Sequence, residues 1–158
     1  TRMEREGISY QEALEGAQAA GIAELDPTLD VDGWDAANKL VIIANSVLRR
    51  PTVLADVQVE GIRGVTREMQ LAAAAEGKVI KLIALAEQRA QSDGGDYALS
   101  VRPTALERDH PLARTGLWDM GVVYYTDCMG IISAVIEAKG PVPTSAAVLR
   151  DMINLYRG

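Results

Sequence analysis

Hydrophobic spacing changes along this chain, and the change limits the folds that it can adopt. Up to about residue 48 the apolar residues recur at helical spacing, which returns at 66–76 and 144–156. Elsewhere the pattern becomes that of strands, at 57–62, 78–86, 97–102, 120–126 and 131–136. Helices grouped early, strands grouped later and a closing helix predict an α+β fold, with helices covering one face of a mostly antiparallel or mixed β-sheet.

Turn residues between the strand segments predict how the strands pair. The segments on either side of 92–95, and those on either side of 127–130, are separated by short turns and should form antiparallel hairpins. Together with the lone segment 57–62 they predict a five-strand sheet. A helix over 80–90 is the alternative for one of these segments.

Capping residues mark the ends of the predicted helices. Ser9 and Glu12 fit a capping box that begins a helix over 9–20. Thr66 is the expected cap of the helix that ends at Gly77. Asp32 is the plausible N-cap of a helix from Trp34 to about Leu48, whose apolar stripe comprises Ala36, Leu40, Ile43 and Val47.

Charge and cysteine content restrict the possible partners and setting. The 16 basic and 22 acidic residues give a net charge of −6, so neither nucleic acid nor an anionic membrane is an expected partner. Cys128 is the single cysteine, and no apolar run approaches the roughly 20 residues that span a bilayer. A reducing, cytoplasmic setting is expected, and the length fits one compact domain.

The start of the chain reads as the last turn of a helix. Residues 1–7 place charges around Met3 and a glycine where a left-handed cap would stand. We therefore expect a longer protein that continues upstream. An artificial boundary or a flexible start is the alternative.

Carboxylates gather in the loop before the helix at Trp34. The loop carries Glu24, Asp26, Asp30 and Asp32, and such massed negative charge is costly unless the loop binds a cation or an ammonium group. The spacing does not fit a twelve-residue calcium loop, because no glutamate follows at the closing position. The single histidine, His110, gives little support to a zinc or copper site, so no metal site is predicted.

Asp35 and Lys39 lie four residues apart and therefore on one face of the predicted helix. A solvated salt bridge is the plainest interpretation of such a pair. Its position beside the acidic loop favours a second interpretation, in which a lysine that stays protonated donates a proton to a carbonyl oxygen. Cys128 has no evident base nearby, and no Gly-x-Gly-x-x-Gly loop is present to hold a dinucleotide.

Two neighbouring stretches resemble the signature of the homoserine dehydrogenases. They are Gly21-Ile-Ala-Glu-Leu-Asp-Pro27 and Asp30-Val-Asp-Gly-Trp-Asp-Ala-Ala-Asn-Lys-Leu40, and shorter similar segments occur at 1–4, 59–62, 80–82 and 110–113. The resemblance implies that residues 1–158 are the catalytic and dimerisation domain of an NAD(P)-dependent oxidoreductase. That enzyme interconverts L-aspartate 4-semialdehyde and L-homoserine, in the aspartate pathway to threonine and methionine.

The resemblance also implies roles for individual residues. Lys39 matches the proton donor, and Asp35 matches the acid that holds the substrate beside it. Glu24 matches the carboxylate that recognises the substrate's amino group, and Asp30 supports these residues. Two glycines match positions at the cofactor's edge, Gly21 and Gly140.

Other expected parts lie outside this chain. The family implies an N-terminal Rossmann domain with the dinucleotide cradle, a further lysine and a monovalent-cation site. The last helix, from Thr144, would pack on that domain, and the late strands would pair two subunits into a homodimer. This chain alone is expected to be inactive.

One segment departs from the family pattern. Where the family has a glycine-rich run, residues 136–143 keep only Gly140 and carry the bulky Glu137 and Lys139. A related oxidoreductase acting on another small carbonyl or hydroxy compound is therefore the alternative function. A non-enzymatic dimerisation or amino-acid-binding module is the third interpretation.

Overall fold

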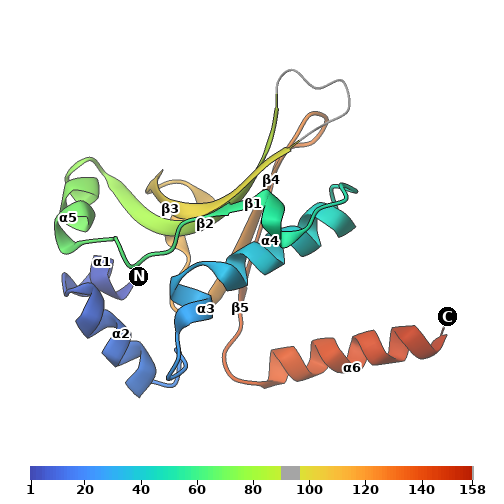
Figure 1. Ribbon diagram of the computed structural model, residues 1–158, viewed down its shortest axis with the longest axis horizontal. Coiled ribbons are helices and arrows are strands. Elements are labelled where there is room, and N and C mark those ends of the chain that lie inside the picture. The colour runs from blue at the N-terminus through green and yellow to red at the C-terminus, as the bar shows by residue number, and fades with distance from the viewer. Residues whose placement is uncertain (90–96, 158) are drawn as a thin grey trace. The chain divides into compact units, whose positions relative to one another are not determined.

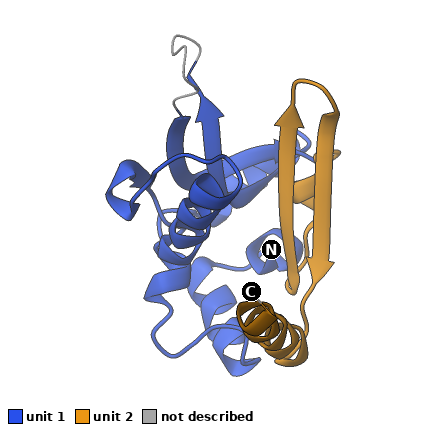
Figure 2. Cartoon of the chain, turned by 90° about the vertical axis from the view of Figure 1, so that its right-hand side faces the viewer, with its two compact units in different colours: residues 1–108 blue, residues 109–158 orange. Residues whose placement is uncertain are grey.

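The computed structural model describes residues 1–89 and 97–157, and the chain divides into two compact units. Unit 1 comprises residues 1–108 and unit 2 comprises residues 109–158, coloured blue and orange in Figure 2. Each unit is described by itself.

Unit 1 combines helices with a three-stranded sheet (Figure 1). Its helical elements are α1 (Arg2–Glu6), α2 (Tyr10–Ala19), α3 (Thr28–Val31), α4 (Trp34–Ser46), the 3₁₀ turn η1 (Leu54–Asp56) and α5 (Arg67–Ala75). Its strands are β1 (Val57–Val59), β2 (Lys78–Gln88) and β3 (Tyr97–Glu107). β3 lies in the centre, antiparallel to β2 and parallel to β1. The sheet is thus mixed, and the predicted α+β class is confirmed.

Helix α4 packs on the sheet through small and branched side chains. Ala37, Leu40 and Ala44 are buried on the helix, and Ala37 and Leu40 form a core cluster with Val57, Leu99 and Val101 of the strands. Alanines on this face allow the helix to approach the sheet closely. The predicted stripe is confirmed for Leu40, which is buried, and for Ala36, which packs against the core cluster, but it was wrong for Val47, which is 53% exposed.

Local capping explains where several helices begin. The Ser9 hydroxyl accepts a hydrogen bond from the Glu12 amide (3.3 Å), and the Glu12 carboxylate accepts one from the Ser9 amide (2.8 Å), which confirms the capping box. Thr66 caps α5 in the same way through the Met69 amide (3.2 Å).

The predicted N-cap Asp32 was wrong. Gly33 occupies the cap of α4 with a φ of 85°, and the Asp32 carboxylate binds Arg63 instead. The ion pair to Arg63 therefore replaces the local hydrogen bond that a capping aspartate would make.

Unit 2 contains a hairpin and a long helix. Its elements are the 3₁₀ turn η2 (Pro111–Arg114), β4 (Asp119–Thr126), β5 (Gly130–Glu137) and α6 (Val142–Arg157). The strands pair antiparallel from Asp119 opposite Glu137 to Thr126 opposite Gly130. His110 ties η2 to β4, since its Nδ1 accepts from the Leu112 amide (3.1 Å) and its Nε2 contacts the Tyr125 hydroxyl (3.0 Å).

The strand prediction was correct for the two antiparallel strand pairs and wrong in placing all five strands in one sheet. Both hairpins are confirmed, although the predicted turn at 92–95 lies outside the described residues. In 1–89 and 97–157 the five strands form a three-stranded and a two-stranded sheet, where one five-strand sheet was expected. No helix in the described part of the chain is long and apolar enough to cross a membrane.

Candidate functional site

The acidic segment between α2 and α4 is ordered by its own hydrogen bonds. Asp26 Oδ1 accepts from the amide (3.1 Å) and the hydroxyl (2.6 Å) of Thr28, which begins the short helix α3. These bonds lower the pKa of the Asp26 carboxyl. The side chain of Gln18 on α2 donates to the backbone oxygens of Glu24 (3.0 Å) and Leu25 (3.2 Å), so this part of the segment is tied to α2.

The predicted pair Asp35 and Lys39 is formed on the first turns of α4. Lys39 Nζ donates to Asp35 Oδ2 at 2.6 Å, and the side chain of Lys39 is 55% exposed and that of Asp35 46%. Because Ala37 and Leu40 anchor the same helix in the core, the backbone beneath the pair is held in place. Asp35 also lies near the N-terminus of α4, where the helix dipole favours negative charge.

Asp30 shows that the acidic segment and the pair share one electrostatic environment. Partial burial raises the pKa of the Asp30 carboxyl, and the negative charges of Asp35 and Glu24 raise it further, while Lys39 acts in the opposite direction. The structure therefore brings together four of the predicted residues. We call Glu24, Asp30, Asp35 and Lys39 the acid–lysine cluster.

A clamp from the segment after β1 holds the backbone between two members of the cluster, Asp30 and Asp35. Arg63 binds the Asp32 carboxylate through Nε and, at 3.3 Å, through Nη2, and the Ile62 amide donates to the Val31 oxygen at 2.7 Å. Gly61 permits this approach: a Cβ there would lie 2.3 Å from the Val31 oxygen and 2.5 Å from the Asp32 Cα. The acid–lysine cluster thus rests on residues fixed to the sheet.

Sequence reasoning missed this clamp. Arg63 and Gly61 lie about thirty positions from their partners, and an arginine on a loop carries no signal of the carboxylate that it binds. A glycine directly after a strand segment was the available hint, since such glycines often mark a close approach of two backbones.

The two glycines predicted at the cofactor's edge occur in different units. Gly21 follows α2 with a φ of 68°, and Gly140 precedes α6 with a φ of 72°. A Cβ at either position would meet no described atom within 4 Å, so the surface beside each backbone is open. The left-handed conformation already favours glycine at both places.

The departure at 136–143 forms an exposed ion pair in unit 2. Lys139 Nζ lies 2.8 Å from Glu137 Oε1, and this contact raises the pKa of the lysine. Among the residues that the structure describes, no three His, Cys, Asp or Glu side chains are grouped so that they could hold a metal ion. Cys128 is exposed as a free thiol in the turn between β4 and β5.

Comparison with known proteins identifies what this arrangement is similar to. The family model described as homoserine dehydrogenase matches residues 1–153. A curated homoserine dehydrogenase from a Synechocystis strain is 39% identical over 98% of the chain, and an NAD(+)-dependent homoserine dehydrogenase from Pseudomonas canavaninivorans is 33% identical over 96%. A crystal structure of homoserine dehydrogenase from S. aureus superposes with a TM-score of 0.88 at 33% identity, over 98% of the chain.

The matches extend over only part of each relative. The chain spans 36% of the length of the Synechocystis protein, 42% of the Pseudomonas protein and 38% of the S. aureus chain. The remaining part of each relative has no counterpart in these 158 residues.

Proposed function

Because the chain belongs to the homoserine dehydrogenase family, we propose that it is the substrate-binding and catalytic part of an oxidoreductase that interconverts L-aspartate 4-semialdehyde and L-homoserine. The observation that carries the proposal is the 2.6 Å ion pair of Lys39 with Asp35, which interacts electrostatically with the carboxylate of Asp30. An ammonium group placed among carboxylates can bind and move a proton where a carbonyl oxygen gains negative charge.

In the proposed mechanism Lys39 donates a proton to the carbonyl oxygen of the semialdehyde and accepts it back in the reverse direction. NAD(P), when bound, supplies or accepts the hydride. Asp35 orients Lys39 through their hydrogen bond and holds the substrate beside it. This arrangement holds the proton donor close to the oxygen that receives the proton.

Glu24 has a different task in the proposal. Its carboxylate binds the substrate's ammonium group, which keeps its charge through the whole reaction. Such a contact strengthens the ground state and the transition state alike, so it contributes to binding more than to turnover. Asp30, which interacts electrostatically with Glu24, adds negative charge near the ammonium site.

We place most of the dinucleotide site in the part of the enzyme that corresponds to the unmatched length of the relatives. Within this chain, Gly21 and Gly140 offer open backbone surfaces that fit the edge of such a cofactor. The monovalent-cation site and the packing partner of α6 belong to that same part of the enzyme in this proposal. An exposed free thiol, Cys128, agrees with a cytoplasmic location.

We also propose that β4 and β5 form a homodimer interface. Every residue of β5 is exposed, including the apolar Ile131, Ile132, Val135 and Ile136. A two-stranded hairpin with an uncovered apolar face is marginally stable by itself, so a second copy would stabilise it. Sedimentation at micromolar concentration should show a dimer, and a strict monomer would contradict this interface.

The test of the catalytic proposal is Lys39→Ala in the intact enzyme, with this chain and a dinucleotide-binding domain both present. General acid–base catalysis contributes roughly 10²–10⁴-fold, so turnover should fall at least about a hundredfold while the melting temperature stays nearly unchanged. Glu6→Ala is the matched control, because it removes another exposed i,i+4 ion pair, with Arg2. If Lys39→Ala keeps turnover within about threefold of the parent, the pair is only a solvated salt bridge.

A second candidate rests on the ion pair of Glu137 and Lys139 beside Gly140. Bulky charged side chains there favour a related reaction on another small carbonyl or hydroxy compound. The two candidates are separated by kcat/KM measured for homoserine and for homologous hydroxy acids. A preference for homoserine of tenfold or more, about 1.4 kcal/mol, supports the first candidate.

A further inference from the structure

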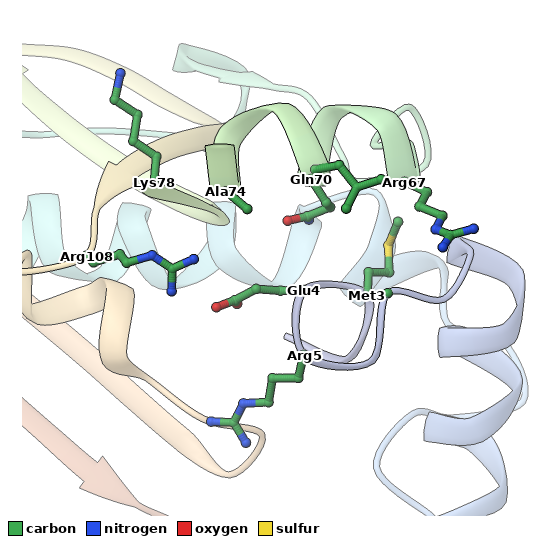
Figure 3. Close-up of a pocket in the computed structure, with 10 residues that line it drawn as sticks. Met3, Glu4, Arg5, Arg67, Gln70, Ala74, Lys78 and Arg108 are labelled. Atoms are coloured by element: carbon green, nitrogen blue, oxygen red, sulfur yellow. The ribbon is translucent and has the colours of Figure 1, made fainter. Parts of the chain in front are cut away.

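Unit 1 contains a cavity that the proposed reaction does not use. It has a volume of about 210 Å³ and is lined by residues of α1, α5 and the ends of β2 and β3 (Figure 3). None of the acid–lysine cluster residues lines it. Since a water molecule takes about 30 Å³ in the liquid, the space suits a small organic molecule or an inorganic ion with its water.

The cavity has an excess of positive charge. Its ionisable lining residues are Glu4, Arg5, Arg67, Lys78 and Arg108. The Glu4 charge is balanced by Lys81 at 3.2 Å, and that of Lys78 by Glu76 at 3.1 Å and Glu107 at 3.8 Å. Within residues 1–89 and 97–157, the three arginines make no ion pair. An anion entering the cavity would therefore meet the guanidinium group of Arg108, whereas those of Arg5 and Arg67 point outward in Figure 3.

A buried polar side chain points to the same conclusion. Gln70 on α5 lines the cavity and is 9% exposed, yet its side-chain amide makes no hydrogen bond to any residue that the structure describes. The amide atoms of Gln70 are not among the buried polar atoms without a partner, so water reaches them through the cavity, and a ligand there can take the place of that water. Figure 3 shows Gln70 reaching down from α5 toward the space that Arg108 enters from the end of β3.

We propose that this cavity binds a small anion through a carboxylate or phosphate group held by Arg108 and Gln70. The planar guanidinium of Arg108 can donate two parallel hydrogen bonds to such a group, and the Gln70 amide can donate a third. Arg5 and Arg67 add positive charge at the rim. The apolar side chains of Met3 and Leu71 accommodate the remainder of an organic ligand.

The experiment uses this chain, labelled for NMR, and two probes, sodium phosphate and sodium succinate. Each is titrated at constant ionic strength, because exposed charges are screened by salt. At least one probe should shift the Gln70 side-chain amide and the Arg108 Nε–H resonances saturably, with a Kd of roughly 1 mM or tighter. Saturation by phosphate alone identifies a phosphate site, and saturation by succinate alone identifies a carboxylate site.

Two variants and a matched control separate a specific site from general attraction. Arg108→Met should raise the Kd of the probe that binds by about tenfold or more, and Gln70→Leu should raise it by about threefold or more. Arg102→Met is the control, since it removes one positive charge from an exposed position of β3 that does not line the cavity. It should leave the Kd within about twofold.

Three outcomes would overturn the proposal. They are no saturable shift with either probe, an unchanged Kd in Arg108→Met, or an equal loss in Arg102→Met. Arg108 is exposed at the end of a strand, so its variant should fold, and a dispersed NMR spectrum of each variant verifies this. Failure here leaves the catalytic proposal intact, because the two sites share no residue.

Discussion

The two units differ in how they use their apolar residues. Apart from Ala113, the buried apolar residues of the described chain all lie in unit 1. Unit 2 instead exposes apolar residues along β4, β5 and α6, among them Met120, Ile136, Leu149 and Leu155. Unit 1 thus has a core of its own that fixes the acid–lysine cluster. The exposed apolar residues of unit 2 instead indicate binding to another protein surface.

The largest effect should come from matched leucine truncations in the two units. Leu40 is 4% exposed in the core of unit 1, so Leu40→Ala should lower the free energy of unfolding of this chain by about 2–5 kcal/mol. Leu149 on α6 is 59% exposed, and Leu149→Ala should change it by less than about 0.5 kcal/mol. Urea denaturation measures both. Similar losses in the two variants would remove the contrast between the units.

An intermediate effect should come from the clamp that fixes the acid–lysine cluster. Gly61→Ala places a methyl group against the backbone of Val31 and Asp32, so the two segments must separate, at a cost of about 1–3 kcal/mol. Gly64→Ala is the matched control, because a Cβ there meets no described atom within 4 Å. Denaturation of the two variants should differ by at least about 1 kcal/mol. Equal stabilities would show that the clamp is loose.

The smallest effect concerns the titration of Asp30. The pKa of Asp30 is raised in the folded state, first by burial and then by the charge of Asp35. Protonated Asp30 therefore stabilises the fold at a pH below its unfolded-state pKa, and this stabilisation is lost as the pH rises through its folded-state pKa. Asp35→Asn should lower the Asp30 pKa, since it removes a neighbouring negative charge. NMR titration of the carboxyl carbons measures the change. An unchanged Asp30 pKa would show that Asp30 does not interact electrostatically with Asp35, contrary to its place in the cluster.

Short-range chemistry made much of unit 1 predictable. The capping box of Ser9 and Glu12 and the cap at Thr66 depend on residues three positions apart, so their sequence signals were sufficient. The pair Asp35 and Lys39 was predictable for the same reason, because helical geometry brings i and i+4 together.

The features that were not predictable depend on distant contacts. Asp32 suits an N-cap by its chemistry, but Arg63, 31 residues away, binds its carboxylate. Helix α3 is only four residues long and starts at the Asp26–Thr28 turn, too short for a hydrophobic period to reveal it. The parallel pairing of β1 with β3, at Val57 opposite Leu99, leaves no trace in the local pattern of either strand.

The most direct test of the account asks whether the amino group of Lys39 itself moves the proton. Lys39 Nζ donates a hydrogen bond of 2.6 Å to Asp35 Oδ2 in this structure. In the intact enzyme, Lys39→Ala therefore leaves space beside Asp35. Homoserine oxidation by this variant should rise with added methylamine, whereas oxidation by the parent enzyme should not, because a small amine can replace the missing group. A Lys39→Ala enzyme that methylamine does not rescue, together with a Lys39→Arg enzyme of full activity, would contradict the assignment, since arginine keeps the charge and cannot exchange the proton.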